Sequence, residues 1–357
     1  MYKQTLDKLK GEGLLRTLRP LGKDLLVFCS NDYLGLTKHP YVIKKTHDAL
    51  KLYGTGSGAS PLISGHSEEH EKLRKKIARH KRLKSALLFS SGYAANVGAI
   101  TALLNEKDTV IIDRLNHASI IDACRLSKAK LQVYGHKDMT ALKKILERSK
   151  GFDKRLIITD TVFSMDGDIA PIAEIVSLAK RYNAMSMVDD AHATGVLEEN
   201  KAGVDIVMGT MSKALAAQGG FVAGPKLLID YLANKARSFI YSTALPPHVC
   251  ATAYAALEVV EENPGIREKL WANVNYLKEG LGLKSESQIL PIMVGDSGKA
   301  VKIAKRLLKQ GILLSAIRPP TVPANTARLR LTVTSAHTRE QMDKLKQEIQ
   351  KELYHRK

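Results

Sequence analysis

The chain has 357 residues, 44% of them hydrophobic and 25% charged, as is typical of a globular protein too long for a single compact core. No apolar run approaches the ~20 residues that a membrane span needs, and the polar N-terminus lacks a signal-peptide core, so we expect no membrane association. The net charge of +19 raises the hypothesis of a nucleic-acid binder, but the 5% of aromatic residues are not interleaved with the basic ones, which makes nucleic acid an unlikely partner.

The densest cluster of positive charge is "KLRKKIARHKRLK", residues 72–84. Its apolar residues fit one face of a helix and its charges surround the rest, as in a solvated surface helix. An alternative is that the stretch attracts an anionic substrate or an acidic carrier protein, with Lys75, Lys76 and Lys81 as the residues to test by charge reversal.

From about residue 85 to residue 224, short β-rich runs alternate with amphipathic helical patterns. This alternation predicts an α/β fold with a mainly parallel seven-stranded sheet covered on both faces. Ligands bind beyond the carboxyl ends of the strands in such sheets. The runs are "ALLFSS", "TVIID", "LQVY", "LIITDTVF", "MSMVDD", "DIVMGT" and "GGFVAG".

After residue 236 the pattern changes to two longer helices, 246–262 and 264–282, short strands and a closing helix from about residue 338. We expect a smaller α+β C-terminal domain here. The predicted division is an N-terminal segment 1–38, a large domain 39–235 and a small domain 236–357.

Polar residues follow several of the predicted strands. "SSGYAAN" places Gly92 and Tyr93 at a strand-to-helix turn, where free backbone N–H groups form an anion site or simply a helix cap. His117 follows "TVIID" and is either structural or within reach of a ligand.

"MSMVDDAH" ends a strand with Asp189, Asp190 and His192. Three interpretations compete: an acidic helix cap, support for a cationic cofactor, or a metal site. The metal site would need further ligands, for which the candidates are Asp160, Asp166 and Asp168.

Lys213 lies in "DIVMGTMSKALAAQGG", among glycines, alanines and small hydroxyls. Loss of hydration lowers the pKa of such a lysine, which can then attack an aldehyde; otherwise it is an ordinary lysine at a helix end. Pyridoxal phosphate (PLP) needs a lysine of this kind, a carboxylate for its pyridine nitrogen and an anion site. Lys213, Asp189 and the turn at Gly92 supply these in order along one sheet.

Eight ordered motifs, spread from about residue 15 to residue 340, resemble the α-oxoamine synthases, which are fold-type-I PLP enzymes that condense an amino acid with an acyl thioester. They are "NDYLGL", "GSGASPLISG", "SGYAAN", "DRLNHAS", "FSMDGD", "VDDAHATG", "SKALAAQGG" and "IYSTALPP". The chain departs from that family at Ala193, Ala216 and Ala217, where relatives are richer in glycine or serine.

Within the family, residues 316–332 are similar to the members that act in biotin synthesis. This resemblance implies condensation of L-alanine with pimeloyl-CoA or a pimeloyl-acyl-carrier protein to 8-amino-7-oxononanoate, CO2 and free thiol. The alternatives are a glycine C-acetyltransferase, or another α-oxoamine synthase, and a basic binding protein without catalysis.

The resemblance also implies roles for residues around the cofactor. Lys213 would form the Schiff base and act as general base, and Asp189 would keep the pyridine nitrogen protonated. His117 would stack on the ring, while Ser164 and His192 would hydrogen-bond near its phenolic oxygen.

The phosphate and the substrates would be held by other matched positions. Gly92, Tyr93 and Thr210 would bind the phosphate, together with Ser242 and Thr243 from a neighbouring subunit of a homodimer. Substrate binding would fall to four further residues: Arg16, Asn31, Arg318 and Thr321.

Cysteine usage bears on metal binding and on the compartment. Cys29, Cys124 and Cys250 are odd in number and far apart, which indicates reduced thiols in the cytoplasm and neither a disulfide framework nor a zinc site. We expect no bound metal.

Overall fold

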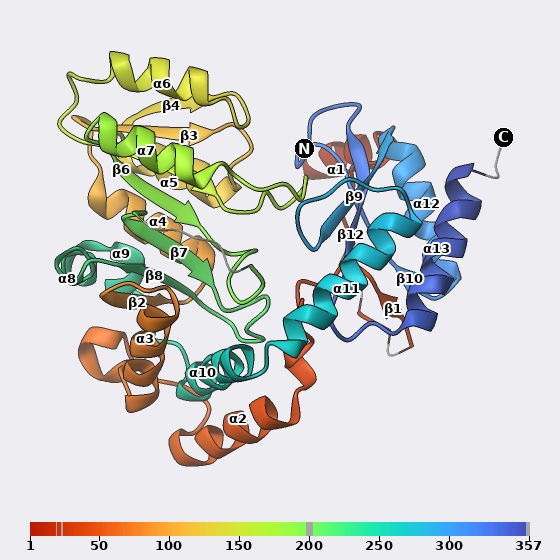
Figure 1. Ribbon diagram of the computed structural model, residues 1–357, viewed down its shortest axis with the longest axis horizontal. Coiled ribbons are helices and arrows are strands. Elements are labelled where there is room, and N and C mark those ends of the chain that lie inside the picture. Colours follow the sequence, from red (N-terminus) through yellow and green to blue (C-terminus); the bar gives the residue numbers. More distant parts are fainter. Residues whose placement is uncertain (19, 23, 198–202, 355–357) are drawn as a thin grey trace. The chain divides into compact units, whose positions relative to one another are not determined.

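The computed structural model describes residues 1–18, 20–22, 24–197 and 203–354 (Figure 1). The chain forms two compact units. The first unit comprises Met1–Leu34, Ser164–Asp168 and Gly265–Lys357, and the second comprises Gly35–Phe163 and Ile169–Pro264. Each unit is described by itself.

The second unit is built on a seven-stranded sheet with the order β2-β8-β7-β6-β5-β3-β4 (Figure 1). Strand β8 is antiparallel to both of its neighbours and the other pairings are parallel, so the predicted mainly parallel sheet is confirmed. The strands are β2 (Ser85–Phe89), β3 (Thr109–Asp113), β4 (Lys130–Tyr134), β5 (Arg155–Asp160), β6 (Met185–Asp189), β7 (Ile206–Thr210) and β8 (Gly220–Gly224).

Both faces of this sheet are buried, because alternate residues of the apolar strands enter different cores. In β3, Val110 and Ile112 join one core and Ile111 joins the other. The first core includes side chains of α4 (Gly92–Leu103), α5 (Ala118–Ser127), α8 (Lys226–Lys235) and α9 (Arg237–Ile240). The second includes side chains of α6 (Met139–Arg148) and α7 (Ile172–Arg181).

Three further helices pack together in the second unit: α2 (Pro40–Tyr53), α3 (Glu68–His80) and α10 (Pro247–Glu262). The Thr46 and Thr252 hydroxyls lie 2.7 Å apart, and the Tyr41 hydroxyl donates to Glu258 at 2.8 Å. The predicted domain boundary at residue 236 is therefore wrong. Residues up to 264 stay with the sheet, because α10 buries its apolar face against α2 and α3.

The first unit contains an antiparallel sheet of order β11-β12-β9 and a parallel pair, β1 with β10. Of the predicted N-terminal segment 1–38, residues 1–34 belong to this unit, in which β1 pairs with β10, whereas residues 35–38 belong to the second unit. The elements of the first unit are α1 (Tyr2–Gly11), β1 (Leu26–Val27), α11 (Gly265–Gly280), β9 (Ile289–Gly295), α12 (Ser297–Lys309), β10 (Ile312–Leu313), β11 (Ser315–Ile317), β12 (Ala327–Thr332) and α13 (Arg339–Tyr354).

Two buried arginines of β12 hold residues 164–168 in the first unit. Arg328 Nη1 donates to Asp166 Oδ1 at 2.6 Å and to the Met165 carbonyl at 3.1 Å. Arg330 Nε donates to the Ser164 carbonyl at 2.6 Å. Charge-assisted bonds of this kind bind a segment that has no strand or helix of its own.

The C-terminal end of α3 carries a histidine in an unusual environment. His80 Nδ1 lies 3.1 Å from Glu261 on α10, and the imidazole is only 16% exposed. Burial, together with the charge of Lys81, outweighs the Glu261 carboxylate and lowers the pKa of His80 to about 4. His80 is therefore neutral in the folded protein at neutral pH.

This histidine predicts a loss of stability in mild acid. Below about pH 6.5, His80 becomes protonated in the unfolded chain. In the folded chain His80 stays unprotonated until the pH falls to about 4. The stabilisation is thus complete above pH 6.5 and declines as the pH falls, by about 2 kcal/mol at pH 5. Urea unfolding at pH 7.5 and pH 5 should show that His80→Gln removes this part of the decline. His47→Gln, at an exposed site of α2, should retain it; equal declines in both variants would contradict the prediction.

Candidate active site

Five parallel strands of the second unit bring polar residues to one edge of the sheet. The residues after β2 and β3 are Ser91–Gly92 and His117, and β5, β6 and β7 end at Asp160, Asp189 and Thr210. Asp160 lies directly opposite Asp189 in the register of β5 and β6. The structure therefore gathers these sequence-predicted positions at the carboxyl edge, where α/β sheets bind ligands.

Asp189 is a buried carboxylate, with 3% of its surface exposed. Its Oδ2 accepts from Asn96 Nδ2 at 2.9 Å, and its Oδ1 accepts from the Ala191 N–H at 3.0 Å. Asn96 also donates to Ser119 Oγ at 2.9 Å. Sequence reasoning gave Asn96 no role, although the residue ends the motif "SGYAAN".

Lys213 lies in the turn between β7 and β8, and its Nζ is 3.0 Å from His192 Nε2. The lysine is half-buried, and its neighbours Ala214 and Leu215 are buried. The turn is closed by a bond from the Ala216 N–H to the Lys213 carbonyl at 3.1 Å. Ala216 has a φ of 55°, in the left-handed region that glycine adopts more easily.

His117 forms the N-cap of α5. Its Nδ1 accepts from the Ser119 N–H at 3.3 Å and lies 2.7 Å from Ser119 Oγ. Burial lowers the pKa of His117 more than the nearby Asp189 carboxylate raises it, and the charge of Lys213 lowers it further. The imidazole is thus neutral at neutral pH.

Asp160 is a second buried carboxylate at this edge. Its Oδ2 accepts from Asn116 Nδ2 at 2.6 Å and from the His117 N–H at 3.1 Å. Burial and the charge of Asp189 raise the pKa of Asp160. The sequence pattern indicates Asp160 only as a candidate metal ligand. Among the described residues no three His, Cys, Asp or Glu side chains are grouped so that they could hold a metal ion.

The turn before α4 provides backbone donors for an anion. Ser91 Oγ caps the helix by accepting from the Ala94 N–H at 3.0 Å. A Cβ on Gly220 would lie 2.5 Å from the Ser91 carbonyl oxygen and 2.6 Å from the Gly92 nitrogen, so only glycine fits there. The hydroxyl of Tyr93, in contrast, donates to Asp122 Oδ2 on α5 at 2.5 Å.

Two hydroxyl groups from the end of β7 adjoin this turn. A Cβ on Gly92 would lie 3.6 Å from Thr210 Oγ1. Thr210 Oγ1 is 2.7 Å from Ser212 Oγ. Sequence reasoning missed Ser212; its place directly before Lys213 in "TMSK" was the available signal. Together with the N-terminus of α4, these groups suit a phosphate.

Ser242 and Thr243 are in the lining of a cavity that also includes Ser90, the residue before the Ser91–Gly92 turn. The cavity has a volume of about 320 Å³ and is also lined by Phe239, Leu245 and His66, whereas Lys213, Asp189 and His117 are not in its lining.

The remaining sequence-predicted residues belong to the first unit. Arg16 Nη2 donates to Thr321 Oγ1 at 3.2 Å, and Arg318 Nη2 donates to the Leu15 carbonyl at 3.0 Å. Arg318 Nε is buried without a partner among the described residues. Burial, with the charge of Arg16, lowers the pKa of Arg318.

Asn31 and Ser164 are also held in the first unit. Asn31 Oδ1 accepts from the Tyr33 hydroxyl at 2.9 Å and from Arg330 Nη1 at 3.2 Å. Arg330 also binds the Ser164 carbonyl, so one arginine fixes both residues. Sequence reasoning did not identify it.

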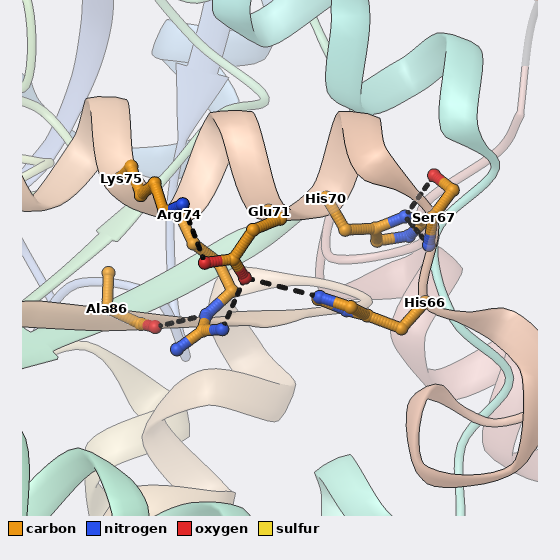
Figure 2. Close-up of polar contacts among 7 residues, drawn as sticks. All are labelled: His66, Ser67, His70, Glu71, Arg74, Lys75 and Ala86. Carbon is orange, nitrogen blue, oxygen red and sulfur yellow. Dashed lines mark hydrogen bonds and ion pairs between the residues drawn. The ribbon is translucent and has the colours of Figure 1, made fainter.

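Several cations of the basic stretch 72–84 form ion pairs with acidic side chains. Glu71 accepts a hydrogen bond from Arg74 and pairs with Lys75 (Figure 2); the distances are 2.7 Å to Arg74 Nη1 and 3.6 Å to Lys75 Nζ. Lys76 forms an ion pair with Glu261 at 2.6 Å and is only 13% exposed. Lys81 pairs with Asp190 and is 7% exposed. The hypothesis that these lysines form a docking surface is therefore wrong for Lys76 and Lys81.

No helix in the described part of the chain is long and apolar enough to cross a membrane.

The family model for aminotransferase class I and II matches residues 23–349. The chain is 47% identical to an 8-amino-7-oxononanoate synthase of Citrifermentans bemidjiense over 94% of each chain. It is 44% identical to 8-amino-7-oxononanoate synthase 2 of Bacillus subtilis, over 98% of this chain and 97% of that one.

Solved structures agree with these sequence matches. A serine palmitoyltransferase from S. paucimobilis with PLP and myriocin bound is 29% identical, with a TM-score of 0.91 over 98% of this chain and 96% of that chain. An 8-amino-7-oxononanoate synthase from Francisella tularensis is 27% identical, with a TM-score of 0.78 over 94% of this chain and 99% of that chain. The chain therefore belongs to the aminotransferase class I and II family and, within it, to the 8-amino-7-oxononanoate synthases.

Proposed function

We propose that this protein uses PLP to condense L-alanine with a pimeloyl thioester, giving 8-amino-7-oxononanoate, CO2 and free thiol in biotin synthesis. The observation that carries the proposal is the contact of Lys213 Nζ with His192 Nε2 at the sheet edge that also carries the buried Asp189. Relatives named for this synthase activity align along nearly the whole chain.

The residues at the edge fit PLP. Asp189 offers a buried carboxylate to the pyridine nitrogen, and Asn96 fixes that carboxylate through a 2.9 Å bond. The N-terminus of α4 at Gly92, with Thr210 and Ser212, would hold the phosphate. When bound, PLP supplies an aldehyde for amino groups and a ring that stabilises negative charge at the substrate α-carbon.

Each residue of the site then has one physical task. Lys213 Nζ, once uncharged, takes the proton from the α-carbon of L-alanine. Asp189 keeps a proton on the pyridine nitrogen, because a buried carboxylate favours a cation beside it. His117, neutral because burial lowers its pKa, offers an uncharged imidazole ring to the cofactor.

Substrate carboxylates require cations, and the first unit supplies a pair. Arg318 has a buried Nε–H without a partner among the described residues, and Arg16 lies near enough to lower the pKa of Arg318. A bound carboxylate would satisfy that donor and reduce the repulsion between the two guanidinium groups. We assign Arg318 to the carboxylate of L-alanine, with Arg16, Asn31 and Thr321 in the same substrate site.

We further propose a cytoplasmic homodimer in which Ser242 and Thr243 contribute to the phosphate site of the partner subunit. Their position in the lining of a cavity that excludes Lys213 supports this assignment. The free thiols of Cys29, Cys124 and Cys250 suit a reducing compartment.

Lys213→Ala should lower kcat by about 10²–10⁴-fold, because it removes the group that moves the α-proton. Wild-type protein incubated with PLP should absorb visible light, and borohydride should leave PLP attached to Lys213, as located by peptide mass spectrometry. Lys226→Ala, at an exposed lysine of the same unit, serves as the control and should behave as wild type. A folded wild-type protein with no visible band would contradict the proposed function.

Arg318→Leu should raise the KM for L-alanine about 10–100-fold, since one charge-assisted bond to a carboxylate is lost. Arg339→Leu, at an exposed arginine of the same unit, is the matched control. Steady-state assays with pimeloyl-CoA and with a pimeloyl-acyl-carrier protein, each tried with L-alanine and with glycine, would check substrate choice. Preferred turnover of glycine with acetyl-CoA would favour the sibling activity.

The shared phosphate site predicts complementation between two impaired variants. Lys213→Ala and Ser242→Ala/Thr243→Ala, co-expressed with different tags, should form mixed dimers in which one site has all of its residues. Assays of purified mixed dimers should therefore show activity well above that of either parent. Mixed dimers no more active than their parents would place the two hydroxyls outside the partner's site.

A further inference from the structure

Asp190, the residue after Asp189, is fully buried and anchors the turn that follows β6. Its N–H donates to the Met208 carbonyl of β7 at 2.7 Å. Its Oδ1 accepts from Thr161 Oγ1 at 2.8 Å, and its Oδ2 accepts from Thr194 Oγ1 at 3.3 Å. The turn itself is closed by bonds from the Ala193 and Thr194 N–H groups to the Asp190 carbonyl, at 3.1 and 2.9 Å.

The charge that balances Asp190 comes from a distant part of the sequence. Lys81, at the C-terminal end of α3, donates its Nζ to Asp190 Oδ2, and both side chains are out of solvent. The same Nζ lies 5.9 Å from the centre of the Phe221 ring on β8. The Lys81 side chain is only 7% exposed, so this lysine of the basic stretch 72–84 is not available to an external partner.

A buried ion pair of this kind contributes less to net stability than to a fixed geometry, because desolvation of both charges offsets their attraction. Removal of one partner, however, leaves a buried charge that must recruit water or move. Asp189 directly precedes Asp190, and His192 follows it by two residues. A movement of Asp190 would therefore also displace these two residues, which are proposed to face the cofactor. His192 in turn contacts Lys213 at 3.0 Å.

We propose that Lys81 is a positioning residue for the proposed reaction: its ion pair with Asp190 holds the turn that presents Asp189 and His192 to PLP. Lys81 touches neither substrate nor cofactor and acts through Asp190. This inference rests on the proposed function for its consequence in catalysis, but the ordering of the turn can be measured without PLP.

The first test is hydrogen–deuterium exchange of the full-length protein, read on peptides that cover residues 190–197. Lys81→Met should speed exchange of the Ala193 and Thr194 amides on the order of tenfold, since the Asp190 carbonyl that they bond is no longer fixed. Lys75→Met, on the same basic stretch but 71% exposed, should leave exchange unchanged. Unchanged exchange in Lys81→Met would overturn the proposal.

The second test separates positioning from stability. Lys81→Met should weaken PLP binding on the order of tenfold and lower kcat, with little change in the KM for L-alanine, whose assigned arginine lies in the first unit. Lys81→Met/Asp190→Asn removes the unpaired carboxylate, and we expect this double variant to regain thermal stability while PLP binding and kcat stay low. Full recovery of both PLP binding and kcat in the double variant would overturn the proposal.

The two tests also distinguish this inference from the proposed function. If exchange is faster in Lys81→Met but the wild-type protein binds no PLP, the role of Lys81 in holding the turn is supported and the assignment of PLP as cofactor is contradicted. Normal exchange with wild-type PLP binding in both lysine variants would retain the function and refute the role of Lys81.

Discussion

The candidate active site depends on the burial of three carboxylates at adjacent strand ends. The parallel register of β5 and β6 sets Asp160 opposite Asp189, and Asp190 follows at once. Each carboxylate has its own partners: the Asn116 amide for Asp160, the Asn96 amide for Asp189 and the Lys81 ammonium for Asp190. Without these donors, the carboxylates would take up protons or be drawn towards solvent, because a buried unpaired charge is unfavourable by several kcal/mol.

The surroundings of the three carboxylates also differ in how they affect the negative charge of each one. Burial and the neighbouring Asp189 raise the pKa of Asp160, whereas Asp190 is neutralised by the lysine. Asp160 and Asp189 have uncharged partners of the same kind, a side-chain amide and a backbone N–H, but burial and the charge of Asp189 favour the protonated form of Asp160. Asp189 is therefore the carboxylate that we assign to a cationic ring, since an ionised carboxylate favours a cation beside it.

The sequence predicted the sheet well and its polar partners poorly, for a physical reason. Strands such as "TVIID" are recognisable because both of their faces are buried, which demands a run of apolar residues. Asn96 and Arg330 were missed, and Lys81 was assigned to the surface, because a hydrogen-bond partner is selected by proximity in three dimensions, which periodicity does not encode. The domain boundary at residue 236 was wrong for a related reason: the amphipathic pattern of α10 shows that one face is buried but does not say against which helices.

Ala216, in the turn that carries Lys213, adopts a φ of 55°. A Cβ in the left-handed region is unfavourable by about 1–2 kcal/mol relative to the usual backbone. An alanine in place of glycine also reduces the conformational entropy of the unfolded chain, which stabilises the folded state by roughly 0.4–1 kcal/mol. The strain is the larger of the two effects, so replacement of Ala216 by glycine should favour folding by up to about 1 kcal/mol. The alanine therefore lowers stability slightly, and its main consequence is a turn around Lys213 that moves less freely than the same turn with glycine would.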